Sequence, residues 1–434
     1  MKFRLLPLAF IALGAWNPTV VLGQTQNQSD ESNYFLRTLK FSGSIRERWE
    51  ATDGPFSLTP ADSYLISQER LGVLFHPTEW LNFFAEAQDA RVLFYQTTPS
   101  SVMQNPIDLH QAWVSVGRAE GPGFFVKFGR QDVVLGSGHL IASTDTWWTN
   151  TARNFDIAHG SYTNSVFKTE LLAGSVVAID PTGIDQHKTG DHVYADYNTF
   201  PHLIPGASVE PYFISHTGIG AKSKDGQTGA SDTLAFGLRI AGKIPGRVDY
   251  NIEPLHEFGS YADDRLSASA LLGGAGWVIT NSGWKPRLVT DYTYASGDNG
   301  QKNGVRETFD NMYGYNFPTN SLTGQFYFRN IKDLRSGIEF YPWKKLKIKL
   351  DGRQFWLADV HDGLYSGLGT RTVFNPKATS AHVGESVEMM ATAALSKHTT
   401  AGFGVGTLFP GEYLKQSNKD QAFIYPYMFV TQTF

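Results

Sequence analysis

Polar and apolar side chains alternate along most of this chain, in segments of roughly ten residues. In the segment 346–356, Leu346 and Ile348 hold one parity while Lys347 and Lys349 hold the other. Successive side chains of a β-strand point to opposite faces. The pattern therefore predicts strands that have one apolar face and one charged face.

About 18 segments of this kind follow one another. The expected strands are 41–50, 63–76, 80–92, 107–117, 124–134, 154–163, 165–178, 191–199, 207–216, 232–242, 247–258, 266–279, 284–295, 327–340, 345–358, 383–396, 399–409 and 421–433. Short joints such as 77–79 and 342–344 alternate with long loops at 135–153, 296–326 and 359–382. Short turns at one end and long loops at the other are typical of outer-membrane barrels. We predict an all-β fold: one closed antiparallel transmembrane β-barrel of about 18 strands, with short periplasmic turns and long extracellular loops.

A soluble β-sandwich also alternates, and it is the main alternative fold. A sandwich buries its apolar face, and its second face rarely carries arginine and aspartate as densely as these segments do. In lipid the arrangement is inverted, with apolar side chains outside and charges inside. The sheet must then close, because an open edge leaves unsatisfied backbone groups in hydrocarbon.

The two ends of the chain agree with an exported barrel. Residues 1–23 resemble a secretory signal, with basic residues, an apolar stretch over 5–13 and small residues before Gln24. The stretch is shorter than the roughly 20 residues that span a bilayer core. The last segment ends on the aromatic Phe434. We expect a signal peptide over 1–23, a barrel over 24–434 and a place in the outer membrane of a Gram-negative cell.

The composition of the chain argues against several classes of function. Without the expected signal the chain has 35 basic and 41 acidic residues, a formal charge of −6, which argues against a nucleic-acid partner. It has no cysteine, hence no disulfide, no thiol catalysis and no cysteine metal site. Its 43 glycines and 14% aromatic residues suit tight turns and aromatic girdles. No stretch after the signal is apolar enough for a transmembrane helix.

The charged parity gives the candidate site. If these side chains face a water-filled lumen, most of them pair with one another, and a subset of arginines attracts an anionic solute, because guanidinium stays charged and matches a carboxylate. The candidate carriers are Arg46, Arg48, Arg70, Arg130, Arg239, Arg287, Arg335, Arg353 and Lys349. The candidate acidic residues that hold them in place are Asp291, Asp333, Glu339 and Asp351.

Several short stretches, in this order and spacing, resemble the alginate export family of outer-membrane porins. They are Gly43 to Arg48, Asp108 to Trp113, Phe128 to Asp132, Thr149 to Asp156, Pro286 to Leu288, Ala295 to Asp298, Asn330 to Arg335 with Pro342, and Phe355 to Ala358. Each stretch is a weak motif alone, and together they cover nearly the whole mature chain. Arg130 belongs to the candidate site on this resemblance, since its parity is ambiguous.

The resemblance implies a monomeric 18-stranded barrel whose arginine-rich pore passively conducts an anionic polysaccharide such as alginate. It implies no cofactor, no metal and no enzyme activity. The expected partners are the anionic polysaccharide and outer-membrane lipid, with a periplasmic export scaffold as a further candidate and no nucleic acid. An uptake porin for sugar acids or small organic anions is the alternative, because it shares the fold and differs in direction and solute size.

A barrel hydrolase is the remote alternative. Such enzymes use Ser/His or Asp/His groups near the outer rim, and His361, Asp362, Ser380 and His382 lie close together in sequence. Two other motifs have plain structural explanations. The alternating glycines of 402–406 predict a small inward strand face, not a phosphate loop. Asp298 in the turn 296–298 could hold a cation, although turn chemistry accounts for it.

Overall fold

The computed structural model describes residues 37–53, 62–96, 98–143, 149–315, 321, 324–367 and 369–434. The predicted signal peptide at 1–23 lies outside these residues.

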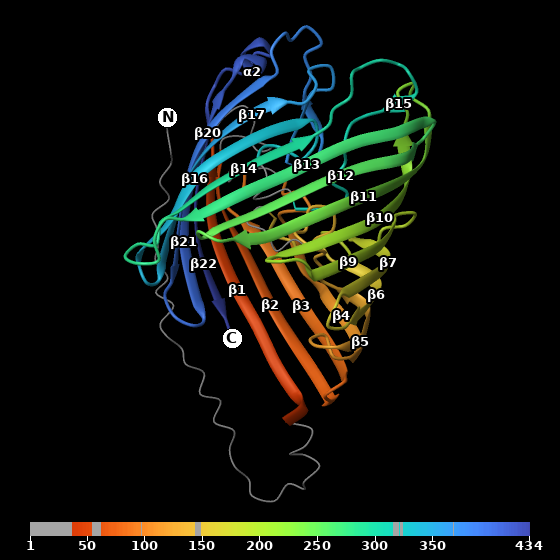
Figure 1. Ribbon diagram of the computed structural model, residues 1–434, viewed down its shortest axis with the longest axis vertical. Helices are drawn as coiled ribbons and strands as arrows, with labels where there is room; N and C mark the ends of the chain where they lie inside the picture. The colour runs from red at the N-terminus through yellow and green to blue at the C-terminus, as the bar shows by residue number, and fades with distance from the viewer. Residues whose placement is uncertain are drawn as a thin grey trace, which may run out of the picture.

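The chain forms a closed barrel of 18 antiparallel strands (Figure 1). Each strand pairs with the next along the wall, and the last strand closes the circle by pairing with the first, with Arg48 opposite Phe429. The barrel strands are β1 (Leu39–Thr52), β2 (Asp62–Thr78), β3 (Leu81–Leu93), β4 (Asn105–Gly117), β5 (Gly123–Gln131), β6 (Phe155–Thr163), β7 (Lys168–Ala178), β9 (His192–Ile204), β10 (Ala207–Lys222), β11 (Thr228–Ile244), β12 (Val248–Tyr261), β13 (Asp264–Val278), β14 (Arg287–Ala295), β16 (Ile331–Trp343), β17 (Leu346–Leu357), β20 (His382–Ala394), β21 (Thr399–Pro410) and β22 (Phe423–Thr433). The predicted fold class is confirmed.

The strands present their two parities to different environments. On β11, Phe236 is 54% exposed while its neighbour Ala235 is fully buried. On β12, Ile252 is 45% exposed and Glu253 is 4% exposed. The outer face therefore carries the large apolar side chains, and the charged parity faces inward.

Short turns and long connections alternate around the barrel. Most turns at one end have two to five residues, whereas the other end carries the connections 132–154, 296–330 and 358–381. Connections at this end also contain small elements: β8 (Gln186–His187), β15 (Val305–Arg306), β18 (Leu364–Tyr365), β19 (Arg371–Val373) and α2 (Glu412–Gln416). The sequence pattern did not predict them, because two- to five-residue elements leave no periodic signal. The least accurate predicted strand was 327–340, since β16 runs three to four residues later.

No helix in the part of the chain that the structure describes has the length and apolar character needed to cross a bilayer.

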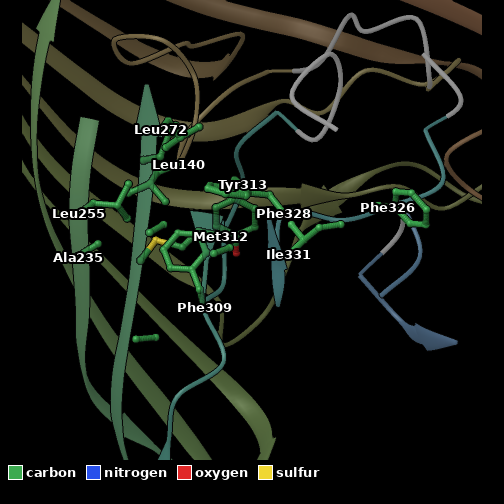
Figure 2. Close-up of a cluster of buried hydrophobic side chains, with 14 of the residues drawn as sticks. Leu140, Ala235, Leu255, Leu272, Phe309, Met312, Tyr313, Phe326, Phe328 and Ile331 are labelled. Atoms are coloured by element: carbon green, nitrogen blue, oxygen red, sulfur yellow. The ribbon is translucent and has the colours of Figure 1, made fainter. Parts of the chain in front are cut away.

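The long loops fold inward and build an apolar cluster against the inner wall (Figure 2). Phe309, Met312 and Tyr313 of the 296–330 connection are buried in the same cluster as Leu255 and Leu272 of the wall. Leu255 shares the inward parity of Glu253, and Leu272 lies opposite Glu253 in the sheet register. A wholly polar inner face was the wrong expectation at this level of the barrel, because the folded loops, and not lipid, cover these apolar side chains.

The alternating glycines of β21 make room for aromatic rings. A Cβ on Gly404 would collide with the ring of Tyr427, and one on Gly402 would collide with Phe429. Both rings are buried, on the adjacent strand β22. The prediction of a small strand face at 402–406 is confirmed.

Candidate functional site: the charged inner wall and its constriction

The wall formed by β14, β16 and β17 carries the densest set of charges. Arg335 on β16 donates from Nη1 to Asp291 Oδ2 on β14 at 2.7 Å, and from Nε to Asp351 Oδ1 on β17 at 3.0 Å. The three residues are neighbours because Asp291 and Arg335 face each other in the register and Gly337, two residues on, faces Asp351. The guanidinium thus joins three strands.

Glu339 is the centre of the same wall nearer the turns. Its carboxylate lies 2.9 Å from Lys347 Nζ, 3.6 Å from Arg287 Nη1 and 3.7 Å from Lys349 Nζ. Arg287 is also held by Asp249 of β12, with Nη2 2.6 Å from Oδ1. Basic side chains therefore outnumber acidic ones immediately around Glu339, and the two lysines remain partly exposed.

Nearer the long loops, Arg353 lies in a buried cluster. It pairs with Asp333, and its Nε lies 3.7 Å from Glu388 of β20. Arg353 and Asp333 have 5% and 2% exposed side chains. Ser386 donates to Glu388 at 2.9 Å. This cluster stiffens the wall, because a buried charge left without its partner is strongly unfavourable.

The wall at β1 and β2 supplies a second basic group. Arg48 pairs with Glu50, which also accepts a hydrogen bond from Tyr64 OH at 2.8 Å. Arg70 donates from Nε to Gln88 Oε1 of β3 at 2.7 Å. Arg46 donates to a backbone oxygen of a loop, 103 residues further along the chain. The inward parity of β1 and β2 thus places these three arginines on the inner face.

Arg239 stands on a third part of the wall, β10 to β12. Its Nη1 lies 2.7 Å from both carboxylate oxygens of Glu210, and Tyr197 OH donates to the same carboxylate at 2.5 Å. Tyr197 stacks on Tyr212, with ring centroids 5.3 Å apart. Tyr212 OH in turn donates to Glu253 at 2.8 Å.

Arg130 does not join the inward group, which corrects the prediction based on the resemblance. It pairs with Asp156 through Nε and Nη2, at 2.9 and 3.0 Å. Asp156 lies between Phe155 and Ile157, which belong to the internal apolar cluster, so Asp156 and Arg130 point to the other face of the sheet. On β5, Arg130 shares the parity of the exposed Phe124 and Phe128, which agrees with this placement.

The connection 132–154 crosses the barrel and narrows it. His139 Nδ1 lies 2.7 Å from Glu253 Oε2 on β12. At the other end of the loop, Gln68 of β2 donates to Asn150 O at 2.6 Å. Strands β2 and β12 are nine strands apart in a ring of 18, so they stand on opposite walls. Glu253 lies five residues from the turn end of its strand and eight from the loop end, which puts this crossing within the barrel. These contacts place the loop inside the barrel, where it forms a constriction.

The connection 296–330 completes the constriction. Tyr313 lies 3.0 Å from His216 Nε2 on β10 and donates to Asp191. Lys188 Nζ also lies 2.6 Å from Asp191. Although burial acts in the opposite direction, the hydrogen bonds from His216, Lys188 and Tyr313 hold the pKa of Asp191 well below its usual value. The ionised Asp191 carboxylate therefore joins Tyr313 of the 296–330 connection to His216 of the wall. We call these contacts the Asp191 clamp.

Sequence reasoning missed Arg153 and Arg329, which lie in the loops. Arg329 lies between the rings of Tyr327 and Tyr365, 5.2 Å from each centroid, and its Nη2 is 2.6 Å from Asp310. Burial alone would raise the pKa of Asp310. The positive charge of Arg329 and its hydrogen bond outweigh this effect, so the pKa of Asp310 is lowered. Burial lowers the pKa of Arg153. Arg153 lies in the expected loop 135–153, where no periodic pattern marks it. Arg329 fell within the expected strand 327–340, but β16 begins only at Ile331, which leaves Arg329 in the loop.

The residues considered for a hydrolase do not form a relay among the described residues. His361 bonds through Nδ1 to Asp359 at 2.7 Å, and His382 lies 3.0 Å from Glu385. Ser380 Oγ accepts a hydrogen bond from the backbone of residue 382. Ser137, His139 and Glu253 are close together, but the serine hydroxyl and the Glu253 carboxylate both contact Nδ1 of His139. A Ser-His-acid triad uses both ring nitrogens.

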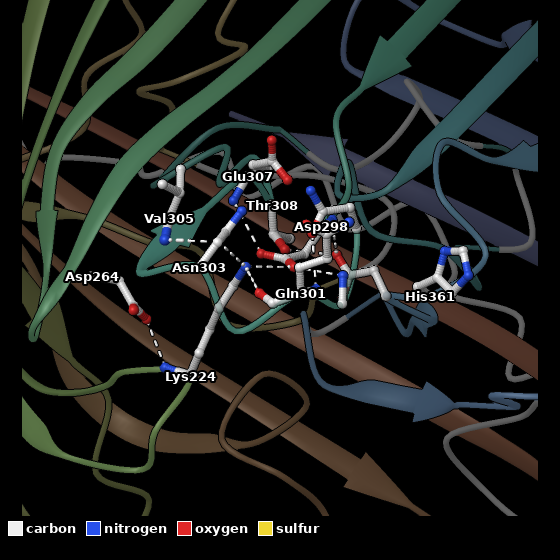
Figure 3. Close-up of polar contacts among 12 residues, drawn as sticks. Lys224, Asp264, Asp298, Gln301, Asn303, Val305, Glu307, Thr308 and His361 are labelled. Atoms are coloured by element: carbon white, nitrogen blue, oxygen red, sulfur yellow. Dashed lines mark hydrogen bonds and ion pairs between the residues drawn. The ribbon is translucent and has the colours of Figure 1, made fainter.

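The turn at Asp298 is filled by the chain's own ammonium group (Figure 3). Lys224 Nζ lies 2.8 Å from Asp298 Oδ1 and donates to Gln301 O at 2.8 Å and Asn303 Oδ1 at 3.3 Å. These oxygen atoms would suit a cation, and the lysine takes that place. The contact joins the β10–β11 loop to the 296–330 connection.

A closed 18-stranded barrel with an inward charged face and inward-folded loops defines an outer-membrane β-barrel channel. Residues 37–423 match the alginate export family, so the chain belongs to that family. No curated protein matches the chain.

Several solved Occ proteins have a similar fold. Acinetobacter baumannii OccAB4 has a TM-score of 0.63 and 11% identity, with 91% of this chain and 98% of that chain covered. Pseudomonas aeruginosa OccK11 (OpdR) has a TM-score of 0.60 and 11% identity, covering 92% and 97%. Pseudomonas aeruginosa OccK2 (OpdF), solved in complex with glucuronate, has a TM-score of 0.59 and 10% identity, covering 92% and 99%. At such identities the likeness establishes the fold.

Proposed function

We propose that this protein passively conducts anionic saccharides through its charged lumen. The proposed carriers are Arg46, Arg48, Arg70, Arg239, Arg287, Arg335, Arg353 and Lys349, positioned by Asp291, Asp333, Glu339 and Asp351. The solute range runs from single sugar acids to uronate polymers such as alginate. Arg130 is left out, since it lies on the other face.

One observation carries the proposal: basic side chains follow one another down a single wall. Arg353, Arg335, Lys349 and Lys347 occupy inward positions on β16 and β17, from the level of the loops to the level of the turns. Each is paired with a carboxylate at 2.7–3.7 Å or in a closer contact. A carboxylated sugar can exchange with these acidic partners at each step, and a mixed wall prevents it from being trapped.

Two further observations support an acidic sugar as the solute. The family of the chain is named for alginate export, and a barrel of the same fold has been solved with glucuronate. Glucuronate combines a carboxylate with hydroxyl groups, which suits guanidinium and tyrosine partners such as Arg239 and Tyr197. Uptake of single sugar acids is the second candidate, and it uses the same wall.

Liposome swelling tests the proposal. Glucuronate, a short oligouronate and an uncharged disaccharide are supplied to liposomes that contain the protein. Glucuronate is expected to enter faster than the uncharged sugar, and the combined Arg335→Gln and Lys349→Gln variant is expected to lose most of that advantage. Equal rates for charged and uncharged sugars in the unaltered protein would overturn the proposal. If glucuronate enters the liposomes and the oligouronate does not, the result would favour uptake of single sugar acids as the function.

A further inference from the structure

The short-turn end of the barrel carries most of its basic side chains along one arc. Four successive short turns join β11 to β12, β13 to β14, β16 to β17 and β20 to β21. They contain no aspartate or glutamate, and their basic residues are Arg247, Lys285, Lys344, Lys345 and Lys397. These hairpins are neighbours around the wall, so the five side chains form a continuous basic arc on the rim.

The basic arc is exposed and lacks carboxylate partners. All five side chains belong to exposed residues. Within the part of the chain that the structure describes, none of them has a carboxylate within 4.0 Å, whereas the charges of the inner wall are paired. Two of the five brace neighbouring turns: Arg247 Nη1 donates to Ile279 O at 3.0 Å, and Lys345 Nζ donates to Leu395 O at 3.3 Å. These bonds hold the cations in place without neutralising them.

The rest of the rim is different. The turn after β2 carries Glu79, and the turn after β4 carries Arg118 and Glu120. Arg118 and Glu79 form an ion pair with each other. The turns 164–167 and 205–206 carry no charge. The unpaired positive charge is therefore confined to one side of the rim.

The two ends of the barrel also differ in sign. The eight short turns contain six basic and two acidic residues, a net charge of +4. The nine connections at the other end contain ten basic and fifteen acidic residues, a net charge of −5. In outer-membrane barrels the short turns face the periplasm. A dissolved polyanion would thus be attracted to the periplasmic mouth and repelled from the outer one.

The basic arc continues into the lumen. Lys347 and Lys349 lie two and four residues beyond Lys345 on β17, and both face inward beside Glu339. A chain with a carboxylate on each sugar can bind the rim and these two lysines at once. A single sugar acid cannot, so the arrangement distinguishes a polymer from its monomer.

We propose that the basic arc is a capture site for a linear polyuronate on the periplasmic side, and that it loads the chain into the lumen for outward passage. This rests on the proposed conduction of anionic saccharides and adds its direction and its preference for polymer. The site works by raising the local concentration of the chain at the mouth, an effect that falls as salt screens the charges.

The experiment is blocking of single channels in a planar bilayer, with the orientation of each channel fixed by a biotin–streptavidin mark on a long loop. Polyuronate is added to one side at a time, at about 0.1 M and about 1 M salt. The test variant changes Lys285, Lys344, Lys345 and Lys397 to Gln; the matched control changes Lys302, Lys377, Lys415 and Lys419 of the long connections to Gln. Heat-modified gel mobility shows that each variant has formed its barrel.

At low salt, block from the short-turn side is expected to be about tenfold more frequent than from the other side. The test variant should remove that difference, the control should keep it, and glucuronate should show none. Equal block from both sides, or a test variant that behaves like the unaltered protein, would overturn the capture site. If the variant loses block by polyglutamate but not by polyuronate, the arc docks an acidic protein and the proposal fails. If neither uronate blocks or permeates from either side, it is the proposed function that fails.

Discussion

The contact between His139 and Glu253 joins strand β12 to the connection 132–154, which begins after β5 on another part of the wall. The imidazole Nδ1 lies 2.7 Å from the carboxylate, which also accepts hydrogen bonds from Ser137 at 2.9 Å and Tyr212 at 2.8 Å. The contact fixes the loop 132–154 at a level within the barrel, five residues from the turn end of β12. Other histidine contacts between loop and wall join His216 to Tyr313 and His110 of β4 to Asn154.

Changing His139 to Ala should open the constriction. The loop loses a hydrogen bond to a charged group, worth about 1.5–3 kcal/mol, so states with the loop displaced should gain roughly ten- to hundredfold in population. Single-channel recording should show larger or noisier conductance. His139→Gln is the matched control, because its amide can still donate to Glu253. Unchanged conductance in the alanine variant would mean that this loop does not limit the pore.

Changing Arg335 to Gln should shift ion selectivity toward cations. Asp291 and Asp351 both lose a guanidinium at 2.7–3.0 Å and remain negative beside the lumen. The reversal potential in a KCl gradient should move toward the potassium potential. Adding Asp351→Asn should restore part of the selectivity, since it removes one of the two uncompensated charges. A single variant that stays as anion-selective as the unaltered protein would show that Arg335 does not face the ion path.

Acid should weaken the Asp191 clamp. Asp191 has a lowered pKa in the folded chain, so its ionised form stabilises the loop contact above the ordinary pKa of aspartate, about 3.9, and that stabilisation is lost as pH falls below it. Gating noise should begin to rise as pH falls below about 4 and should increase further at more acidic pH. Asp191→Asn should show the noise already at neutral pH and lose most of the acid dependence. Noise that rises equally in both proteins would exclude Asp191 as its source.

Two carboxylates share one hydroxyl on the outer face of β1 and β2. Ser67 Oγ lies 2.8 Å from Glu47 and also contacts Glu69, and it has a single hydrogen to donate. Leu71 and Trp49 bracket them on the same face. Acidic side chains facing lipid are unfavourable, so Glu69→Leu should raise the free energy of unfolding in a bilayer by about 1–2 kcal/mol. Denaturant titration in vesicles measures this, and a loss of stability would show that the pair is covered by something other than lipid.

The barrel could be predicted from the sequence because its two faces meet different solvents. Each strand then repeats its chemistry every second residue, as in 346–356, and the repetition marks both the number of strands and the inward parity of Arg335 and Arg353. Boundaries near the long loops were less accurate, as at β16. There the apolar cluster inside the barrel replaces lipid, and Ile331 is buried in it.

The constriction could not be predicted in the same way. Its contacts join residues far apart in the chain, such as His139 to Glu253 and Tyr313 to Asp191, and no periodic pattern marks such pairs. Arg130 was assigned to the lumen on the family resemblance alone, and on β5 it shares the parity of the exposed Phe124 and Phe128. Lys224 in the Asp298 turn is likewise a contact between distant loops.

The reversal potential of single channels in a planar bilayer, measured in a KCl gradient with and without polyuronate, decides most directly whether a charged aqueous passage runs through this barrel. Discrete conductance steps with an anion preference, interrupted by polyuronate, are expected. A protein that forms its barrel yet gives no conductance, or conducts without preference and without block, would contradict the charged lumen on which the rest depends.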